Sequence, residues 1–251
     1  MKFTFHYKTK WHDTDANRQV RPSQILSYMQ ETSNYHLTSN GMSLDELRDR
    51  HGLAFLLSRV AMRIYAPLYT NEEIDVQTWV CESRGLSFHR CFRILRGDEV
   101  IAEAFTVWAL LDLKERKLLP VTAFPYDIEP DPMLGQEFLA RVRMPALEQM
   151  EKVGERKIVY SDIDYNGHMN NTRYPDMLCD FTPDIRMHRA VGVTLSFLNE
   201  AAFDDVLSVY RFERAKGEYC FRTVNEAGKT CLEALLVTEP IETAQENATK
   251  E

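Results

Sequence analysis

The residues between 160 and 174 combine side chains that are able to move protons. Asp162, Asp164, Asn166 and His168 occupy alternate positions along the chain. An imidazole titrates near neutrality, from an ordinary pKa of about 6.5, and a carboxylate can accept a proton or attack a carbonyl carbon. The spacing therefore favours acid–base or nucleophilic chemistry, with an amide beside it to orient the imidazole or hold a carbonyl group.

Two other interpretations of this segment need no catalysis. The pattern D-x-D-x-N-G opens a calcium-binding EF-hand loop, but the twelfth position of that loop requires a glutamate, and this chain has Arg173 there. Asp and Asn are also common helix caps. The mismatch argues against calcium, and it leaves capping and catalysis as alternatives.

A second copy of the pattern lies near the start of the chain. Residues 11–20 align without a gap with residues 160–169, at an offset of 168 − 19 = 149. Two further matches, at 205 − 73 = 132 and 233 − 103 = 130, are collinear with the first. Three collinear matches predict that the chain is a duplicated domain.

The two copies differ in the chemistry that they can do. Gln19 stands where the second copy has His168, and the offset of 132 puts Leu68 where the second copy has Glu200. A capping loop would tolerate either copy, but only the second copy has titratable groups at both places. This contrast predicts one active site and one vestigial site.

The elements around the two loops follow the same order in each copy. A short strand (residues 3–7 and 158–160) leads into the loop, and a helix follows, which in the first copy begins near Pro22. Alternating segments then predict strands, which cover residues 74–80, 88–95 and 100–111 in the first copy and 191–198, 206–212, 219–224 and 231–237 in the second. A long helix followed by an antiparallel meander predicts an α+β unit whose sheet wraps around the helix.

These segments divide the chain into three parts. We predict an N-terminal domain over residues 1–130, a linker with prolines and a glycine over 131–157, and a C-terminal domain over 158–251. From Glu239 the sequence predicts a polar, frayed tail.

Composition excludes several classes of protein. The chain has 251 residues, 44% of them hydrophobic, and its formal charge of 30 − 38 = −8 argues against a general nucleic-acid binder. Its five cysteines form no C-x-x-C pair and favour free thiols in a reducing cytoplasm. No segment has the roughly 18 apolar residues of a membrane span, and the first thirty residues hold no secretory signal. We therefore expect a cytoplasmic protein that neither spans a membrane nor binds nucleic acid.

The order of elements and one motif together resemble a known family. The segment from Asp162 to Tyr174 contains Asn-x-His-x-Asn-Asn, and residues 108–120, WALLDLKERKLLP, look like the segment that closes the first domain in that family. On these features, over nearly the whole chain, the sequence resembles the acyl-acyl-carrier-protein (acyl-ACP) thioesterases of bacteria and plant plastids. The resemblance implies an α+β fold of two tandem hotdog domains, each an antiparallel sheet wrapped around a central helix. It also implies that the N-terminal domain holds the acyl chain.

The resemblance further implies an activity and a catalytic set. The expected reaction is hydrolysis of an acyl-ACP thioester to free fatty acid and holo-acyl carrier protein, which ends fatty acid synthesis, without a cofactor or a metal. The catalytic residues carry over as Asp164, Asn166, His168 and Glu200. In plant members a cysteine follows this glutamate. Ala201 occupies that position here, which excludes a thiol nucleophile at this place.

The expected partner is the acyl carrier protein. Because that protein is acidic, its docking face on this chain should be basic despite the net negative charge. The basic candidates are Arg84, Arg90, Arg93, Arg96, Lys114, Arg116, Lys117, Arg186 and Arg189.

Two mechanisms fit these residues. Glu200 and His168 could activate water as general bases, or Asp164 could attack the carbonyl carbon and form a mixed anhydride. Backbone N–H groups near Asn170 and Asn171, at the start of the following helix, could polarise the carbonyl oxygen. The sequence leaves both mechanisms open.

Three other functions compete with this one. A hotdog acyl-CoA thioesterase would share the chemistry but prefer coenzyme A, and a non-catalytic hotdog protein would bind acyl thioesters without needing His168 and Glu200. A hotdog dehydratase is disfavoured, because such enzymes place the histidine and the acid in a different loop context. A homodimer, the acyl chain length and the choice between carrier protein and coenzyme A stay open.

Overall fold

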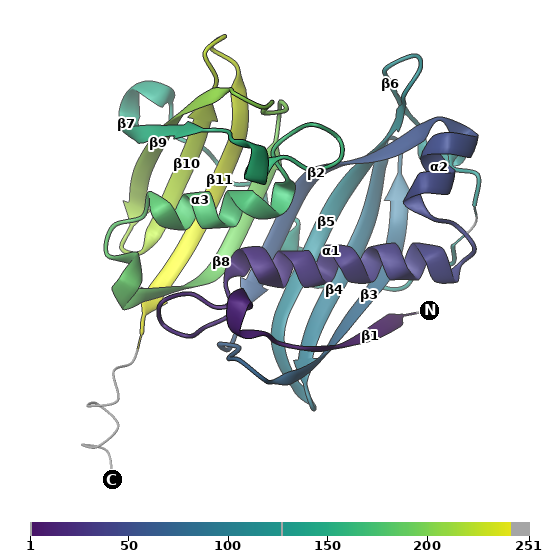
Figure 1. Cartoon of the computed structure of the whole chain (residues 1–251), viewed down its shortest axis with the longest axis horizontal. Helices are drawn as coiled ribbons and strands as arrows, with labels where there is room; N and C mark the ends of the chain where they lie inside the picture. Colours follow the sequence, from purple (N-terminus) through teal and green to yellow (C-terminus); the bar gives the residue numbers. More distant parts are fainter. Residues whose placement is uncertain (1, 127, 242–251) are drawn as a thin grey trace.

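The structure, a computed structural model, describes residues 2–126 and 128–241 and consists of two similar halves (Figure 1). The first half contains β1 (Phe3–Lys8), β2 (Leu53–Ile64), β3 (Glu73–Arg84), β4 (Ser87–Arg96), β5 (Glu99–Asp112) and β6 (Lys117–Leu119). The second half contains β7 (Glu151–Lys157), β8 (His188–Phe197), β9 (Val206–Ala215), β10 (Glu218–Val224) and β11 (Thr230–Pro240). All neighbouring strands are antiparallel.

One helix lies across the sheet in each half (Figure 1). In the first half this helix is α1 (Pro22–Ser39), which has a proline in its first turn and buries Ile25, Leu26 and Met29. In the second half it is α3 (Tyr174–Asp180), a helix of only seven residues. A further helix, α2 (Leu44–His51), follows α1. The structure thus confirms the α+β class with two tandem hotdog domains.

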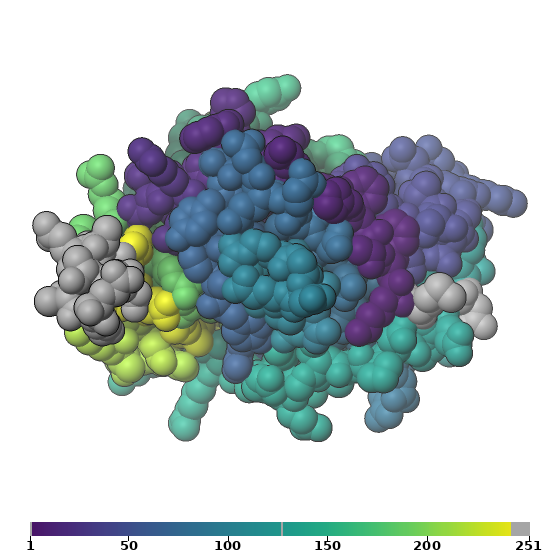
Figure 2. Space-filling model, turned by 90° about the horizontal axis from the view of Figure 1, so that it is seen from below, coloured from purple at the N-terminus to yellow at the C-terminus, as the bar shows by residue number. Residues whose placement is uncertain are grey.

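The two halves are joined into one sheet by the pairing of β2 with β8, which runs from Arg59↔Ser196 to Arg63↔Gly192. Outward from this junction, the first half runs β2-β5-β4-β3-β1 and the second runs β8-β11-β10-β9-β7. The orders are equivalent, so the two halves are related by an approximate two-fold axis at the junction. Seen from below, the green and yellow second half packs directly against the blue and purple first half (Figure 2).

Equivalent hydrogen bonds confirm the duplication. The N–H of Asp15 donates to Gln19 O at 2.8 Å, and the N–H of Asp164 donates to His168 O at 3.0 Å. Both copies also carry a cross-strand ion pair between the fourth and fifth strands of the repeat, Arg93–Glu103 at 2.5 Å and Arg222–Glu233 at 2.6 Å. The same backbone geometry therefore recurs in two places with different side chains on it.

The hydrogen bonds correct the sequence alignment by one residue. Val20 N–H donates to Leu68 O at 2.8 Å. Met169, the residue 149 positions after Val20, donates in the same way to Ala201 O at 2.8 Å. Leu68 therefore matches Ala201, at an offset of 201 − 68 = 133, and Pro67 stands where the second copy has Glu200. The predicted match of Leu68 with Glu200 was wrong, although Pro67 carries no carboxylate either.

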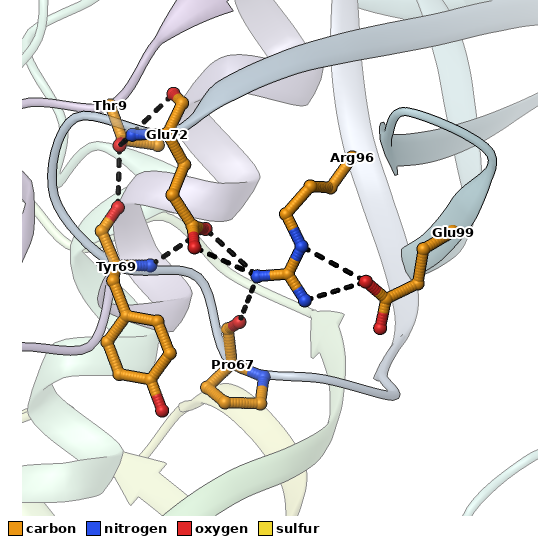
Figure 3. A network of polar contacts seen from close by, with 6 residues as sticks. All are labelled: Thr9, Pro67, Tyr69, Glu72, Arg96 and Glu99. Atoms are coloured by element: carbon orange, nitrogen blue, oxygen red, sulfur yellow. Dashed lines mark hydrogen bonds and ion pairs between the residues drawn. The ribbon is translucent and has the colours of Figure 1, made fainter.

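Arg96 fixes the first-copy corner in place (Figure 3). Its Nη1 donates to Pro67 O at 3.3 Å and pairs with Glu72 at 2.9 Å, and its Nη2 pairs with Glu99 at 2.7 Å. These contacts anchor to β4 the corner that faces the first-copy loop.

Most predicted strands are confirmed, but β2, β6 and β7 were not predicted as strands, and one predicted strand is wrong. Strand β2 was not predicted, because it lies between two other strands and its sequence is nearly continuously apolar instead of alternating. The strand predicted at 158–160 is wrong, since the strand before the second loop is β7, and Tyr160 already begins a 3-10 turn.

The boundaries between the two domains stay a proposal. Strand β7 falls within residues 131–157, the expected linker, and pairs with β9 of the second half. Strand β11 extends to Pro240, into the expected tail, and residues 242–251 of that tail lie outside the described residues. No helix among the described residues is both long enough and apolar enough to pass through a bilayer.

Two glycines with the same backbone conformation offer a test of this packing. Gly217 and Gly228 both have a φ of +74°, but a Cβ built on Gly217 would lie 2.6 Å from Thr238 O, whereas one on Gly228 meets nothing within 4 Å. Gly228→Ala should cost ~1–2 kcal/mol of unfolding free energy through the left-handed conformation alone. Gly217→Ala should cost at least about 1 kcal/mol more, because it also clashes with a carbonyl group.

Urea unfolding of the two variants measures this difference directly. Equal losses of unfolding free energy would show that the hairpin between β9 and β10 moves away from Thr238 without cost.

Candidate active site

The second-copy loop is a tight turn closed by its own polar groups. Gly167 N–H donates to Asp164 O at 3.0 Å, and Asn166 N–H donates to Asp164 Oδ1 at 2.8 Å. Gly167 has a φ of +84°, which a residue with a Cβ adopts only with strain. One carboxylate oxygen of Asp164 is therefore held by the loop itself.

Asp162 has a structural role at the start of this loop. Its side chain is 5% exposed, its Oδ2 accepts from Val159 N–H at 3.0 Å, and its Oδ1 pairs with Arg156 at 2.6 Å. The equivalent Asp13 of the first copy accepts from Lys10 N–H at 2.6 Å. The first aspartate of the motif caps the turn in both copies, so the capping interpretation holds for this residue.

The structure brings His168 and Glu200 together. His168 Nε2 lies 3.0 Å from Glu200 Oε2, and both side chains are partly exposed, by 35% and 54%. The backbone of His168 also forms an isolated bridge with Ala202, which attaches the corner after β8 to the loop. An imidazole and a carboxylate 32 positions apart in sequence (200 − 168 = 32) thus lie within ion-pair distance of each other.

Arg48 is a contact of the loop that the sequence did not predict. It projects from α2 of the first half, its Nη2 donates to Asn166 Oδ1 at 2.5 Å, and its guanidinium lies 4.7 Å from the ring centroid of Tyr165. Because a guanidinium only donates, the contacted atom is the amide oxygen, and the NH₂ group of Asn166 is left to donate to a ligand. No sequence signal links residues 118 positions apart.

All four predicted site residues line one cavity of about 1290 Å³. The second-copy loop contributes Asp164, Asn166 and His168, and the corner contributes Glu200. The apolar lining comes mainly from the first half and includes Leu37, Leu47, Leu53, Phe55, Leu57, Phe88, Trp108 and Phe124. The polar groups of the second copy therefore face an apolar space built by the first.

One of the two candidate amide donors is already occupied. Asn170 N–H donates to Asp162 O at 2.8 Å, so it cannot polarise a substrate carbonyl. Among the described residues, the N–H of Asn171 has no acceptor, and Asn171 lines the cavity. The amide of Asn171 is the remaining candidate of the two.

The first-copy loop has the same shape but lines a smaller cavity of about 420 Å³. Asp15 Oδ1 accepts from Asn17 N–H at 2.8 Å and from Gln19 N–H at 3.1 Å. Pro67 faces it in place of a glutamate. This loop keeps the turn and has lost the acid–base pair.

Comparison with known proteins identifies the family. A model of the acyl-ACP thioesterase N-terminal domain matches residues 1–126, and a model of the C-terminal domain matches residues 147–235. The chain belongs to the acyl-ACP thioesterase family. The resemblance in the sequence is thereby confirmed.

Relatives within this family are distant in sequence. The chain is 21% identical over 224 residues to a chloroplastic acyl-ACP hydrolase of Cuphea viscosissima and 21% identical over 229 residues to a chloroplastic palmitoyl-acyl carrier protein thioesterase of Arabidopsis thaliana. Both matches include 82% of this chain and 53% of the relative, so the chain spans about half the length of these curated relatives.

Solved structures share the fold over nearly the whole chain. An acyl-ACP thioesterase from Bacteroides thetaiotaomicron superposes with a TM-score of 0.82 at 23% identity, covering 95% of this chain and 98% of the other. A 12:0-ACP thioesterase from Umbellularia californica gives a TM-score of 0.82 at 16% identity, covering 96% and 98%. These likenesses establish the double hotdog architecture.

The thiol of Cys179 should be unreactive. Cys179 is part of α3 and lines the smaller cavity, and burial, with Asp176 and Asp180 nearby, raises the pKa of its thiol to about 12. Because only the thiolate reacts, alkylation by iodoacetamide at pH 8 should be about a thousandfold slower than for a cysteine of ordinary pKa.

Peptide mass spectrometry of a labelling time course measures this rate for each cysteine separately, with urea-unfolded protein as the control. Fast labelling of Cys179 in the folded chain would contradict the assignment and reopen thiol catalysis.

Proposed function

We propose that this chain hydrolyses acyl-ACP thioesters to free fatty acid and holo-acyl carrier protein, with Asp164, Asn166, His168 and Glu200 as its catalytic residues. The observation that carries the proposal is the 3.0 Å contact between His168 and Glu200 beside an apolar cavity of about 1290 Å³. An acid–base pair next to a space that suits an alkyl chain is what thioester hydrolysis of a lipid requires.

The contact favours activation of water over direct attack by Asp164. An ionised carboxylate only accepts hydrogen bonds, so a hydrogen bond across this contact would place the hydrogen on Nε2 of His168 and leave Nδ1 with its lone pair. Nδ1 can then take a proton from water while the water oxygen bonds to the thioester carbon. The carbonyl oxygen becomes an oxyanion, for which the Asn166 NH₂ group and the Asn171 N–H are the available donors.

Collapse of this intermediate breaks the carbon–sulfur bond. The electron pair leaves with sulfur, and the protonated His168 returns its proton to the thiolate, which restores the enzyme and releases the acid. Asp164 contributes through the loop, because one of its oxygens already accepts from Asn166 N–H. The mixed-anhydride route is the alternative, and hydroxylamine would trap its acyl-aspartate as a hydroxamate.

The acyl chain is proposed to occupy the cavity of the first half. The lining there is aliphatic and aromatic, so burial of methylene groups contributes about 0.8 kcal/mol each. The second half then holds the reacting atoms and the first half holds the chain.

The docking partner is proposed to be the acyl carrier protein in the cytoplasm, with coenzyme A as the competing donor. Of the basic docking candidates, Arg90 is only 8% exposed and is removed from the set by its burial. Arg116 lines the cavity and is exposed, so it remains a docking candidate. Comparing carrier-protein and coenzyme A thioesters of equal acyl length separates the two functions, and a homodimer stays open.

Activity should reside in the second copy alone. His168→Ala and Glu200→Ala should each lower kcat by a factor on the order of 10²–10⁴, the usual contribution of a general acid or base. Gln19→Ala should cost far less, because Gln19 has no titratable proton. Release of fatty acid from acyl-ACP donors of C8 to C18 measures these rates, after circular dichroism has shown that each variant folds.

Two results would contradict this assignment. If the wild-type chain releases fatty acid from none of the donors, the proposed function is wrong. A folded Gln19→Ala chain as inactive as His168→Ala would remove the distinction between an active and a vestigial site.

Arg48 should support catalysis through Asn166. Arg48→Met removes the hydrogen bond to the amide oxygen and should lower kcat/KM by roughly tenfold, since a hydrogen bond from a charged donor contributes about 1.5–3 kcal/mol when shielded and less when exposed. Arg50→Met is the matched control, because Arg50 belongs to the same helix and pairs only with Glu46, at 3.0 Å. Equal activity of the two variants would show that Arg48 does not orient the amide.

A further inference from the structure

The inner wall of the large cavity carries a buried cation that the proposed hydrolysis does not use. Arg90, on β4, is 8% exposed and lines the cavity. Two other arginines of β4 have acidic partners, Arg93 with Glu103 and Arg96 with Glu72 and Glu99. Among residues 2–126 and 128–241, Arg90 forms no ion pair, so its charge lies in the interior without a partnered carboxylate.

Only one edge of the Arg90 guanidinium is held by the protein. Its Nη1 lies 3.0 Å from His36 Nδ1 and 3.1 Å from Thr78 Oγ1. His36 accepts this hydrogen bond as a neutral ring, and burial together with the charge of Arg90 lowers the pKa of His36 to about 4. In the described part of the chain, Nε and Nη2 of Arg90 have no acceptor, and Arg90 is one of the residues that line the cavity.

A second donor lines the same cavity. Gln30 Nε2, on α1, is enclosed, lines the same cavity and lacks an acceptor within the described residues. Neighbouring hydroxyls are satisfied by their own helix, since Ser27 donates to Ser23 O at 2.9 Å and Ser33 donates to Gln30 O at 2.8 Å. A buried donor costs free energy unless an oxygen atom accepts its hydrogen bond, so an acceptor atom on a ligand in this cavity would be stabilised by Gln30.

The strand register places Arg90 far from the reacting groups. Arg90 pairs with Thr106, Thr106 with Val60, and Val60 with Leu195 of β8. Three strand spacings amount to about 14 Å across the sheet, and the two residues from Leu195 to the end of β8 at Phe197 add about 7 Å along it before the corner that carries Glu200. An acyl chain with its thioester at the His–Glu pair therefore meets Arg90 with its far end.

We propose that Arg90 forms a polar subsite at the far end of the acyl cavity, which binds an oxygen atom on the distal end of the acyl chain. A hydroxyl or carboxylate oxygen would accept hydrogen bonds from Nε and Nη2. A methyl group at the same place would displace water from these donors and offer no acceptor. The subsite favours oxygenated chains of the length that reaches Arg90 and disfavours methyl-ended chains of that length.

This inference rests on the proposed function only in placing an acyl chain in the cavity, so its test does not depend on turnover. Displacement of a fluorescent fatty acid from the full chain measures the binding of free acids from C8 to C18. Each length is compared as the methyl-ended acid, the ω-hydroxy acid and the α,ω-dicarboxylic acid, which separates a hydroxyl from a carboxylate as the preferred end group.

The wild-type chain should bind an oxygenated acid about tenfold or more tightly than its methyl-ended counterpart at the lengths that reach Arg90, as expected for hydrogen bonds from a charged donor. Arg90→Met should abolish this preference and leave the shortest methyl-ended acids unaffected. Arg93→Met, on the same strand but outside the cavity lining, is the control and should retain the preference.

The absence of an oxygen preference in the wild type at every length, or the same preference in Arg90→Met, would overturn the subsite. If Arg90→Met does not fold, Arg90→Lys serves instead. It keeps the charge but lacks the forked donors, so the preference must fall. Fatty acid release from acyl-ACP donors is measured in parallel. An oxygen preference without hydrolysis would refute the proposed function and support the subsite. Hydrolysis without an oxygen preference would support the proposed function and refute the subsite.

Discussion

The pairing of β2 with β8 is the constraint on which the rest of the structure depends. It makes one continuous sheet from two halves and relates them by an approximate two-fold axis. Strand β2 follows the first helix pair and β8 leads to the corner that carries Glu200, so this pairing sets the second-copy loop against α2 and the first-half cavity. The contact between Arg48 and Asn166 exists only because the halves are joined in this register.

The two copies share the same backbone arrangement but differ in helix length and in the side chains of their loops. Both loops have the same turn and the same capping aspartate, but α1 has 18 residues and α3 has seven. The cavities that the two loops line differ accordingly, at about 1290 Å³ and about 420 Å³. The chain thus has two equivalent scaffolds that differ in helix length and loop side chains, and only the second-copy loop carries the His168–Glu200 pair.

Sequence reasoning succeeded where the signal is local. The repeated loop, the strands of the meander and the first helix follow from spacing and alternation within short segments, and all of them are present. It failed at β2, whose apolar residues are enclosed by neighbouring strands and carry no clear period, and at the corner, where the offset of 132 was one residue too small. The second error matched Leu68 with Glu200, although Pro67 is the equivalent residue. Only the backbone hydrogen bonds reveal this error.

The sequence by itself determined the duplication and the family, because a motif of fixed spacing on one loop is preserved in the order of residues, and the resemblance to that family pointed to the four residues proposed to act on a thioester. Only the tertiary structure decided what those residues face. It placed Glu200 3.0 Å from His168 and turned Arg90 from a candidate for a docking surface into a buried wall of a cavity. The physical reason is that burial and contact between distant segments depend on strand register and helix packing, which are properties of the whole fold and leave no mark in the local spacing of residues.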